Sequence, residues 1–87
     1  MRFRIFEWDS RNIDHVARHG VAPSDAEAAC RGGVVFRGRR GRYLAYGRTG
    51  AGRYLLVVVA HHGQGIARVI TARDMTDRER QLYLRRH

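Results

Sequence analysis

The apolar residues of this chain fall into short periodic segments separated by glycines, and one segment is apolar throughout. This segment, residues 54–60, reads YLLVVVA, is rich in β-branched residues and has glycines on both sides. A strand with one face in water would alternate apolar and polar residues, so the unbroken run predicts a central strand covered on both faces. A buried helix is the alternative, and the short length and flanking glycines argue against it.

The N-terminal segments predict a short strand followed by a helix. Residues 2–8 alternate in part between apolar and polar positions, as a strand does. Asp9 or Ser10 can cap the following helix, and Gly20 can end it in the left-handed conformation that glycine adopts readily. The apolar stripe of this helix has the i, i+3, i+4 spacing of a half-buried helix and consists of Ile13, Val16 and Ala17.

Two further helices are marked by capping boxes, in which a serine or threonine and a glutamate three residues later satisfy each other's backbone donors. These helices are expected over residues 24–30 and over about residues 76–86. The last helix has few large apolar residues, so we expect it to cover the sheet poorly by itself and to be mobile or completed by a partner. The two boxes are Ser24 with Glu27 and Thr76 with Glu79.

Four extended segments between the second and the last helix complete the predicted fold. Short glycine-containing loops join them, which is typical of a meander of antiparallel strands. The chain is expected to form one domain over residues 1–87, of the α+β class, with a small antiparallel sheet, two N-terminal helices, a C-terminal helix and the helices against one face. The extended segments are residues 34–36, 42–48, 54–60 and 66–73.

The charge of the chain adds a strong functional constraint. Its 17 basic residues are all arginine and outnumber the 8 acidic residues, which gives a formal net charge of +9. No acidic residue lies in residues 28–73, although nine arginines do. A field of this sign attracts polyanions, so the sequence predicts nucleic acid, anionic lipid or an acidic protein as a partner. A basic surface that is merely solvated is the alternative.

Several classes of protein are disfavoured by what the sequence contains. Cys30 is the only cysteine, so no disulfide framework or cysteine metal cluster is expected and a reducing compartment fits. No run approaches the roughly 18 apolar residues of a membrane span, so we expect a cytoplasmic protein with no membrane partner. The G-x-G within residues 47–52 precedes a strand rather than a helix, which argues against a dinucleotide or phosphate loop, and no cofactor is expected.

Arginines and tyrosines on the predicted sheet suggest how a nucleic acid could bind. Strict alternation puts Arg42, Tyr46 and Arg48 on one face of their strand, and it puts Arg68 and Arg73 on opposite faces of theirs. Some of these arginines should project from the sheet face that no helix covers. Guanidinium groups bind phosphate oxygens and aromatic rings stack on bases, so this surface is typical of single-stranded RNA or DNA binding. Core tyrosines with arginines at their rim are the alternative.

Histidine and glutamate supply the candidates for proton transfer. His19 and His61 are chemically suited to acid or base catalysis near neutral pH, although capping or solvated histidines would look the same in the sequence. His15 and His19 could share a metal on one helix face, but no third ligand is evident, so no metal site is predicted. Glu79 also has a purely structural interpretation as a capping residue.

Taken in order, a series of short motifs resembles the BrnT family of type II toxins. The resemblance implies a RelE/ParE-like toxin fold and a metal-independent ribonuclease that cuts RNA. It also implies a cognate antitoxin of the BrnA kind, which covers the toxin and binds operator DNA as part of the complex. The motifs are residues 6–9 (FEWD), 17–21 (ARHGV), 41–43 (GRY), 47–48 (GR), 54–58 (YLLVV), 69–73 (VITAR), 78–80 (RER) and Tyr83.

The same resemblance implies functional positions. Arg18 stands where the family commonly has lysine, and the helix that precedes it is a residue shorter than in the family; an arginine can hold a phosphate there but donates a proton less readily. In the implied mechanism a ribose 2′-OH attacks the adjacent phosphate, two arginines stabilise the charge, and His19 or Glu79 moves protons. A non-catalytic binding module and a gyrase-directed ParE-type toxin are the alternatives. The catalytic residues that the resemblance implies are Arg18, His19, Arg48, Arg73 and Glu79, and Tyr83 is a further family position, expected to bind nucleic acid. The sheet surface described above adds Arg42, Tyr46 and Arg68 as residues expected to bind nucleic acid.

Overall fold

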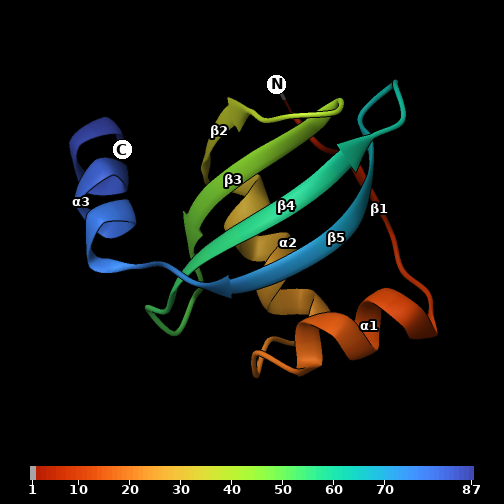
Figure 1. Ribbon diagram of the computed structural model, residues 1–87, viewed down its shortest axis with the longest axis horizontal. Coiled ribbons are helices and arrows are strands. Elements are labelled where there is room, and N and C mark those ends of the chain that lie inside the picture. The colour runs from red at the N-terminus through yellow and green to blue at the C-terminus, as the bar shows by residue number, and fades with distance from the viewer. Residues whose placement is uncertain (1) are drawn as a thin grey trace.

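A computed structural model describes residues 2–87 as a five-stranded sheet with three helices (Figure 1). The strands lie in the order β1-β5-β4-β3-β2. This confirms the predicted α+β class and the predicted order of elements. The elements are β1 (Ile5–Glu7), α1 (Ser10–Ala17), α2 (Pro23–Arg31), β2 (Val34–Arg37), β3 (Arg42–Arg48), β4 (Tyr54–His61), β5 (Ile66–Asp74) and α3 (Asp77–Arg86).

The sheet is mixed rather than wholly antiparallel. Strands β2 to β5 form the expected antiparallel meander, but β1 pairs with β5 in parallel. The reason lies in the connection: after β1 the chain passes through α1 and α2 to the opposite edge of the sheet, and the meander then returns strand by strand until β5 lies beside β1. A sequence pattern that shows only local periodicity does not reveal this long-range pairing.

Helices α1 and α2 cover one face of the sheet and enclose the main core (Figure 1). The central strand β4 contributes Leu55, Val57 and Val59, each with no exposed surface. Helix α2 approaches β3 so closely that a Cβ added at Gly47 would collide with the backbone of Ala29. This contact holds in place the end of β3 at which the candidate site lies. The core residues are Phe3, Val16, Val21, Ala26, Ala29, Cys30, Ala45, Leu55, Val57, Val59, Ala67, Val69 and Ala72.

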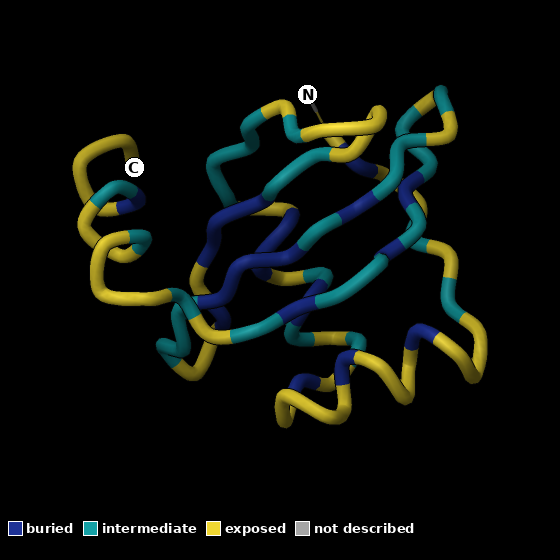
Figure 2. Tube along the Cα trace, in the orientation of Figure 1, coloured by how far each residue is buried: buried dark blue, intermediate teal, exposed yellow. Residues whose placement is uncertain are grey.

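Helix α3 packs on the opposite face, so the prediction that all helices lie against one face is wrong. Its Tyr83 forms a second buried cluster with Tyr46 and Leu56. The helix covers only one end of the sheet: on its face Tyr46 and Leu56 are buried, whereas Leu44, further along β3, is half-buried. Figure 2 shows buried positions gathered along β3 and β4 near α3 and a mixture of buried and half-buried positions further away. The sparse apolar face predicted for this helix is present, since Tyr83 is buried while Leu84 remains 49% exposed.

Two of the three predicted helix starts agree with the structure. Asp9 caps α1, and Thr76 with Glu79 forms the capping box of α3. The predicted start of α2 at Ser24 is wrong: the helix begins at Pro23, and the Asp25 side chain accepts a hydrogen bond from the N–H of Ala22. Proline suits the first helical position because its fixed φ matches the helix and its missing N–H is not needed there.

A β-bulge in β5 changes the distribution of arginines over the sheet. Val58 pairs with Thr71 but its neighbour Val59 pairs with Val69, so Ile70 is the extra residue. On the two sides of the bulge, the side chains of β5 therefore alternate out of step, so that strict alternation across the whole strand gives the wrong face for one side. The prediction that Arg68 and Arg73 point to opposite faces is therefore wrong, because the register places both on the face that carries α3.

None of the helices within residues 2–87 is long and apolar enough to cross a membrane.

Candidate active site

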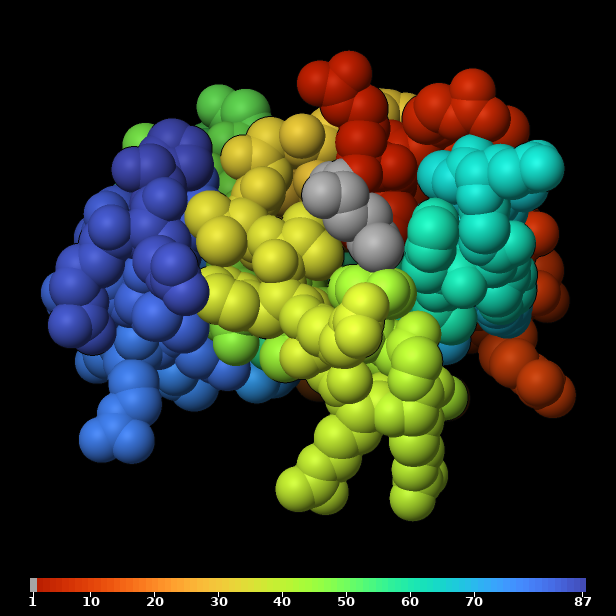
Figure 3. Space-filling view, turned by 90° about the horizontal axis from the view of Figure 1, so that it is seen from above, coloured from red at the N-terminus to blue at the C-terminus, as the bar shows by residue number. Residues whose placement is uncertain are grey.

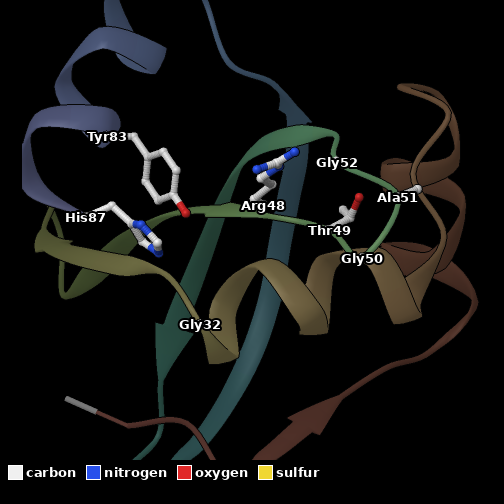
Figure 4. Close-up of a pocket in the computed structure, with 8 residues that line it drawn as sticks. All are labelled: Gly32, Arg48, Thr49, Gly50, Ala51, Gly52, Tyr83 and His87. Carbon is white, nitrogen blue, oxygen red and sulfur yellow. The ribbon is translucent and has the colours of Figure 1, made fainter.

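The candidate site is a cleft of about 470 Å³ at the end of the sheet, between α3 and the β3–β4 turn (Figure 4). Helix α3 forms one wall, the glycine-rich turn forms the opposite wall, and the end of β3 lies between them. Among the described residues that line it there is no carboxylate. The lining residues are Gly32, Arg48, Thr49, Gly50, Ala51, Gly52, Tyr83 and His87.

Arg48 supplies the positive charge of the cleft. It is the last residue of β3, it is exposed, and its guanidinium lies 5.3 Å from the ring centre of Tyr54. Within the part of the chain that the structure describes, no carboxylate forms an ion pair with it. A guanidinium that keeps its charge and has no internal partner is well suited to bind an anionic group from outside.

The turn after Arg48 leaves room for this guanidinium. Gly52 has φ of +89°, a conformation that favours glycine, and a Cβ there would lie 3.2 Å from Nη2 of Arg48. Thr49 closes the turn, since its carbonyl accepts from the N–H of Gly52 and its hydroxyl accepts from the N–H of Arg53. In the sequence these glycines indicate a turn and argue against a phosphate loop, whereas the structure shows that they form a wall of the cleft.

Tyr83 and His87 face Arg48 from α3. They are four residues apart, their rings are 4.9 Å apart, and the Tyr83 hydroxyl points into the space between His87 and Arg48 (Figure 4). Burial raises the pKa of Tyr83, and neighbouring Tyr54 adds to this effect. The phenol therefore stays protonated near neutral pH and can donate a hydrogen bond. The cleft thus combines a fixed cation, a neutral donor and an imidazole.

Beside the cleft, Arg73 and Glu79 form a bidentate ion pair that joins β5 to α3. The two hydrogen bonds measure 2.7 and 2.9 Å, and the side chains are 40% and 19% exposed. Glu79 also accepts from the N–H of Thr76 at 2.8 Å. The bonds from Arg73 hold the pKa of Glu79 below its ordinary value, so this carboxylate stays ionised and is committed to its partners. The geometry fits a residue that positions α3 better than one that carries protons.

Arg18 and His19 are not brought into the cleft. They are exposed at the C-terminal end of α1, on the sheet face opposite α3. The carbonyl of His19 accepts a hydrogen bond from Arg53 at 2.7 Å, and Arg53 in turn pairs with Asp74. The link from His19 toward α3 therefore runs through Arg53 and Asp74, the last residue of β5.

The remaining residues predicted to bind nucleic acid are scattered. Arg42 is exposed at the far end of β3, and Arg68 forms an ion pair with Asp9 at 2.9 Å. Tyr46 and Tyr83 are only 7% and 3% exposed. The stacking surface predicted for Tyr46 is not open in this structure, because α3 packs over the end of the sheet from which Tyr46 projects. The ring of Tyr83 is buried in the same contact.

The histidines illustrate what the sequence interpretation missed. His61 packs between Phe3 and Tyr43, with ring centres 6.0 Å from each, and lies away from the cleft. His87 is not among the predicted site residues, although its spacing of four residues from Tyr83 is the spacing of neighbours on one helix face. Residues 2–87 contain no group of three or more His, Cys, Asp or Glu side chains placed to hold a metal ion.

The fold and cleft together define a small α+β protein with a cationic site suited to a phosphate-bearing ligand. The sequence model of the family described as "Ribonuclease toxin, BrnT, of type II toxin-antitoxin system" matches residues 8–79. The chain therefore belongs to the BrnT family of ribonuclease toxins, which confirms the resemblance seen in its motifs. Membership in a type II toxin-antitoxin family also implies an antitoxin partner.

A solved structure is similar in fold. The crystal structure of the Brucella abortus ribonuclease toxin BrnT, determined at 1.1 Å resolution, superposes with a TM-score of 0.66. The match covers 88% of this chain and 100% of that chain, at 20% sequence identity. Among curated protein sequences, none matches this chain.

Proposed function

We propose that this BrnT-family toxin cleaves RNA at a phosphate bound in the cleft formed by Arg48, Tyr83 and His87. The observation that carries the proposal is the convergence of these three side chains, from the end of β3 and from α3, on one space (Figure 4). Arg48 binds the phosphate, since it is the cleft's unpaired cation within the described residues. The protonated Tyr83 hydroxyl donates to a phosphate oxygen.

In the proposed step the ribose 2′-oxygen attacks the adjacent phosphorus and the bond from phosphorus to the 5′-oxygen breaks. The 2′-hydroxyl proton passes to the imidazole of His87, the imidazole in the cleft, and the departing 5′-oxygen takes a proton from solvent water. The products are a 2′,3′-cyclic phosphate and a free 5′-hydroxyl. Arg48 stabilises the charge that develops on the phosphate, which is typically worth about 3–4 kcal/mol for one well-placed donor.

Arg73 and Glu79 are assigned a positioning role in this proposal. Their ion pair fixes the first turn of α3, the helix that carries Tyr83 and ends directly before His87. Arg73 adds positive charge next to the cleft, but its two terminal nitrogens already bind Glu79. Arg18 and His19 receive no chemical step, because they lie beyond the opposite face of the sheet.

Membership in a toxin-antitoxin family supports a proposal for the biological setting. We propose a cytoplasmic toxin that is neutralised by a BrnA-like antitoxin and reaches operator DNA only as part of that complex. The basic acid-free stretch of the chain supports an acidic or amphipathic antitoxin surface.

Cleavage rates of matched variants test the proposal. Purified wild-type protein, Arg48→Ala and the control Arg11→Ala are incubated with end-labelled RNA under identical conditions. Arg11 is another exposed arginine; it lies on α1, which packs on the sheet face opposite α3, and it does not line the cleft. Arg48→Ala should lose on the order of a hundredfold or more in rate, while Arg11→Ala should stay close to wild type.

Other outcomes would decide against the proposal. Intact RNA with a folded, RNA-binding wild-type protein would favour a non-catalytic binding module. Broken DNA with intact RNA would favour a gyrase-directed toxin. A loss of less than threefold in Arg48→Ala would remove this arginine from the mechanism.

A further inference from the structure

The arginines in the acid-free stretch separate into two groups in the structure. Four of the nine form ion pairs with carboxylates supplied from outside that stretch. Of the five that form none within residues 2–87, one is Arg48 in the cleft, and the other four all lie on the hairpin that joins β2 to β3. We name these four the hairpin arginines: Arg37, Arg39, Arg40 and Arg42.

The backbone of the hairpin is well defined and presents these side chains outward. The N–H of Gly38 donates to the carbonyl of Arg42 at 2.7 Å, and the N–H of Arg42 donates to Arg39 at 3.0 Å. Arg40 and Gly41 then turn the chain with φ of +58° and +72°. All four arginines are exposed, and in Figure 3 side chains of the hairpin extend well beyond the body of the molecule.

The hairpin is connected to the cleft by one continuous strand. Strand β3 runs from Arg42 at the hairpin to Arg48 in the cleft, a distance of roughly 20 Å for a strand of this length. Between these ends, Arg86 of α3 lies over the ring of Phe36 in β2, with its guanidinium carbon 5.3 Å from the ring centre. Positive charge therefore borders the β2–β3 edge at both ends and in between.

We propose that the hairpin arginines bind the phosphate backbone of the single-stranded RNA whose scissile phosphate lies in the cleft. This inference rests on the proposed function and names a second contact region for the same substrate. Flexible exposed guanidinium groups without internal partners suit phosphates that are held without regard to sequence. The hairpin would thus increase affinity for a long substrate and leave the chemical step unchanged.

The composition of the hairpin favours RNA over an acidic protein as the occupant. Residues 37–42 read RGRRGR and offer no apolar or aromatic side chain. Stable protein interfaces depend on a buried apolar or aromatic centre surrounded by a polar rim. A surface made only of arginine and glycine lacks that centre, but it needs none to bind a polyphosphate chain.

Binding of a non-cleavable probe tests the inference independently of catalysis. The probe is a 12-nucleotide single-stranded RNA with 2′-O-methyl groups, which lacks the attacking hydroxyl. Its dissociation constant is measured over a range of salt concentrations for wild type and for a variant with all four hairpin arginines changed to glutamine. A matched control changes Arg2, Arg4, Arg11 and Arg78 to glutamine, so that both variants have a formal charge of +5 instead of +9.

Loss of four phosphate contacts should reduce the slope of log affinity against log salt by about 2 to 3, since each contact on a single strand contributes about 0.7. The control should retain most of the wild-type slope. Equal reductions in both variants would show an effect of net charge alone and would overturn the inference, as would an unchanged slope in the hairpin variant. The double change Arg39→Gln with Arg40→Gln, confined to the tip of the turn, should give about half the reduction if the full variant folds poorly.

Cleavage assays separate this inference from the proposed function. The hairpin variant should cut a dinucleotide, which spans only the cleft, at the wild-type rate, and should lose about tenfold or more in kcat/KM on a long RNA. Failure of the wild type to cut either substrate would refute the proposed function. The salt dependence of RNA binding would still decide whether the hairpin arginines bind RNA. Loss of binding to the cognate antitoxin with an unchanged RNA slope would assign the hairpin to the protein partner instead.

Discussion

Replacement of Glu79 by glutamine distinguishes a positioning role from a catalytic one. Glutamine has nearly the same shape and can still cap the backbone of Thr76, so the change removes mainly the charge and one acceptor from the pair with Arg73. Hydrogen bonds to a charged group contribute about 1.5–3 kcal/mol, against about 0.5–1.5 for neutral ones. Because the Arg73 side chain is 40% exposed, solvent screening reduces this difference, and we expect a loss of about 1–2 kcal/mol in total.

Thermal and denaturant unfolding measure this loss. For a domain of this size, each kcal/mol lowers Tm by about 4–8 °C, so Glu79→Gln should melt roughly 4–16 °C below wild type. Asp77→Asn is the control, because Asp77 is an exposed acid in the same turn of α3 with no ion-pair partner among the described residues. It should lose no more than about 1 kcal/mol, the contribution of a charge at a helix N-terminus.

The contribution of Glu79 to the stability of the fold depends on pH with a defined sign. The folded pKa of Glu79 lies below its ordinary value of 4.5, so its stabilisation is fully present above pH 4.5 and is lost as the pH falls through the folded value. The stability difference between wild type and Glu79→Gln should therefore shrink on acidification below pH 4.5. At pH 7 the variant should retain RNA cleavage within about tenfold of wild type, equivalent to 1.36 kcal/mol in the barrier. A loss beyond a hundredfold in a folded variant would place Glu79 in the chemistry and refute this reasoning.

Three further predictions address the packing, the proton carrier and the thiol. Gly47→Ala should lose at least about 2–3 kcal/mol in denaturant unfolding, because its Cβ would collide with the backbone of α2, whereas Gly50→Ala, with open space around it, should change stability little. His87→Gln should reduce RNA cleavage on the order of a hundredfold and His19→Gln less than threefold. A larger loss in His19→Gln than in His87→Gln would assign the proton transfer to His19 instead. Burial raises the pKa of Cys30 to about 12, so a thiol reagent at pH 8 should label it only under unfolding conditions, and rapid labelling of the native protein would contradict the packing described.

The local features of the fold could be predicted from the sequence because they depend on neighbours in the chain. The apolar run of β4, the alternation of Arg42, Tyr46 and Arg48, and the cap at Thr76 all follow from spacing within a few residues. What could not be predicted depends on distant partners. The parallel pairing of β1, the bulge at Ile70 and the face on which α3 packs are decided by contacts between segments far apart in sequence.

The candidate site could be predicted only in part, because the sequence shows local patterns but not which distant segments come together. Arg48 and Tyr83 were identified from the family resemblance, and the structure places both in one cleft. His87 could not be predicted, because nothing in the sequence shows that this residue, directly after α3, turns toward the end of β3. Arg18 and His19 belong to a motif that resembles the family's, but the helix that they follow covers the other face of the sheet. Their placement in this structure gives them no contact with the phosphate proposed to bind beside Arg48.

The central claim is that the 2′-hydroxyl of RNA is the nucleophile in the cleft. The most direct measurement is an analysis of the ends produced when wild-type protein cuts end-labelled RNA in the presence of EDTA, with a parallel substrate that carries a single 2′-deoxyribose at the cleavage position. We predict upstream fragments that end in 2′,3′-cyclic phosphate, downstream fragments with 5′-hydroxyl ends, and no cleavage at the deoxyribose. Fragments with 5′-phosphate ends, or cleavage at the deoxyribose, would contradict the account.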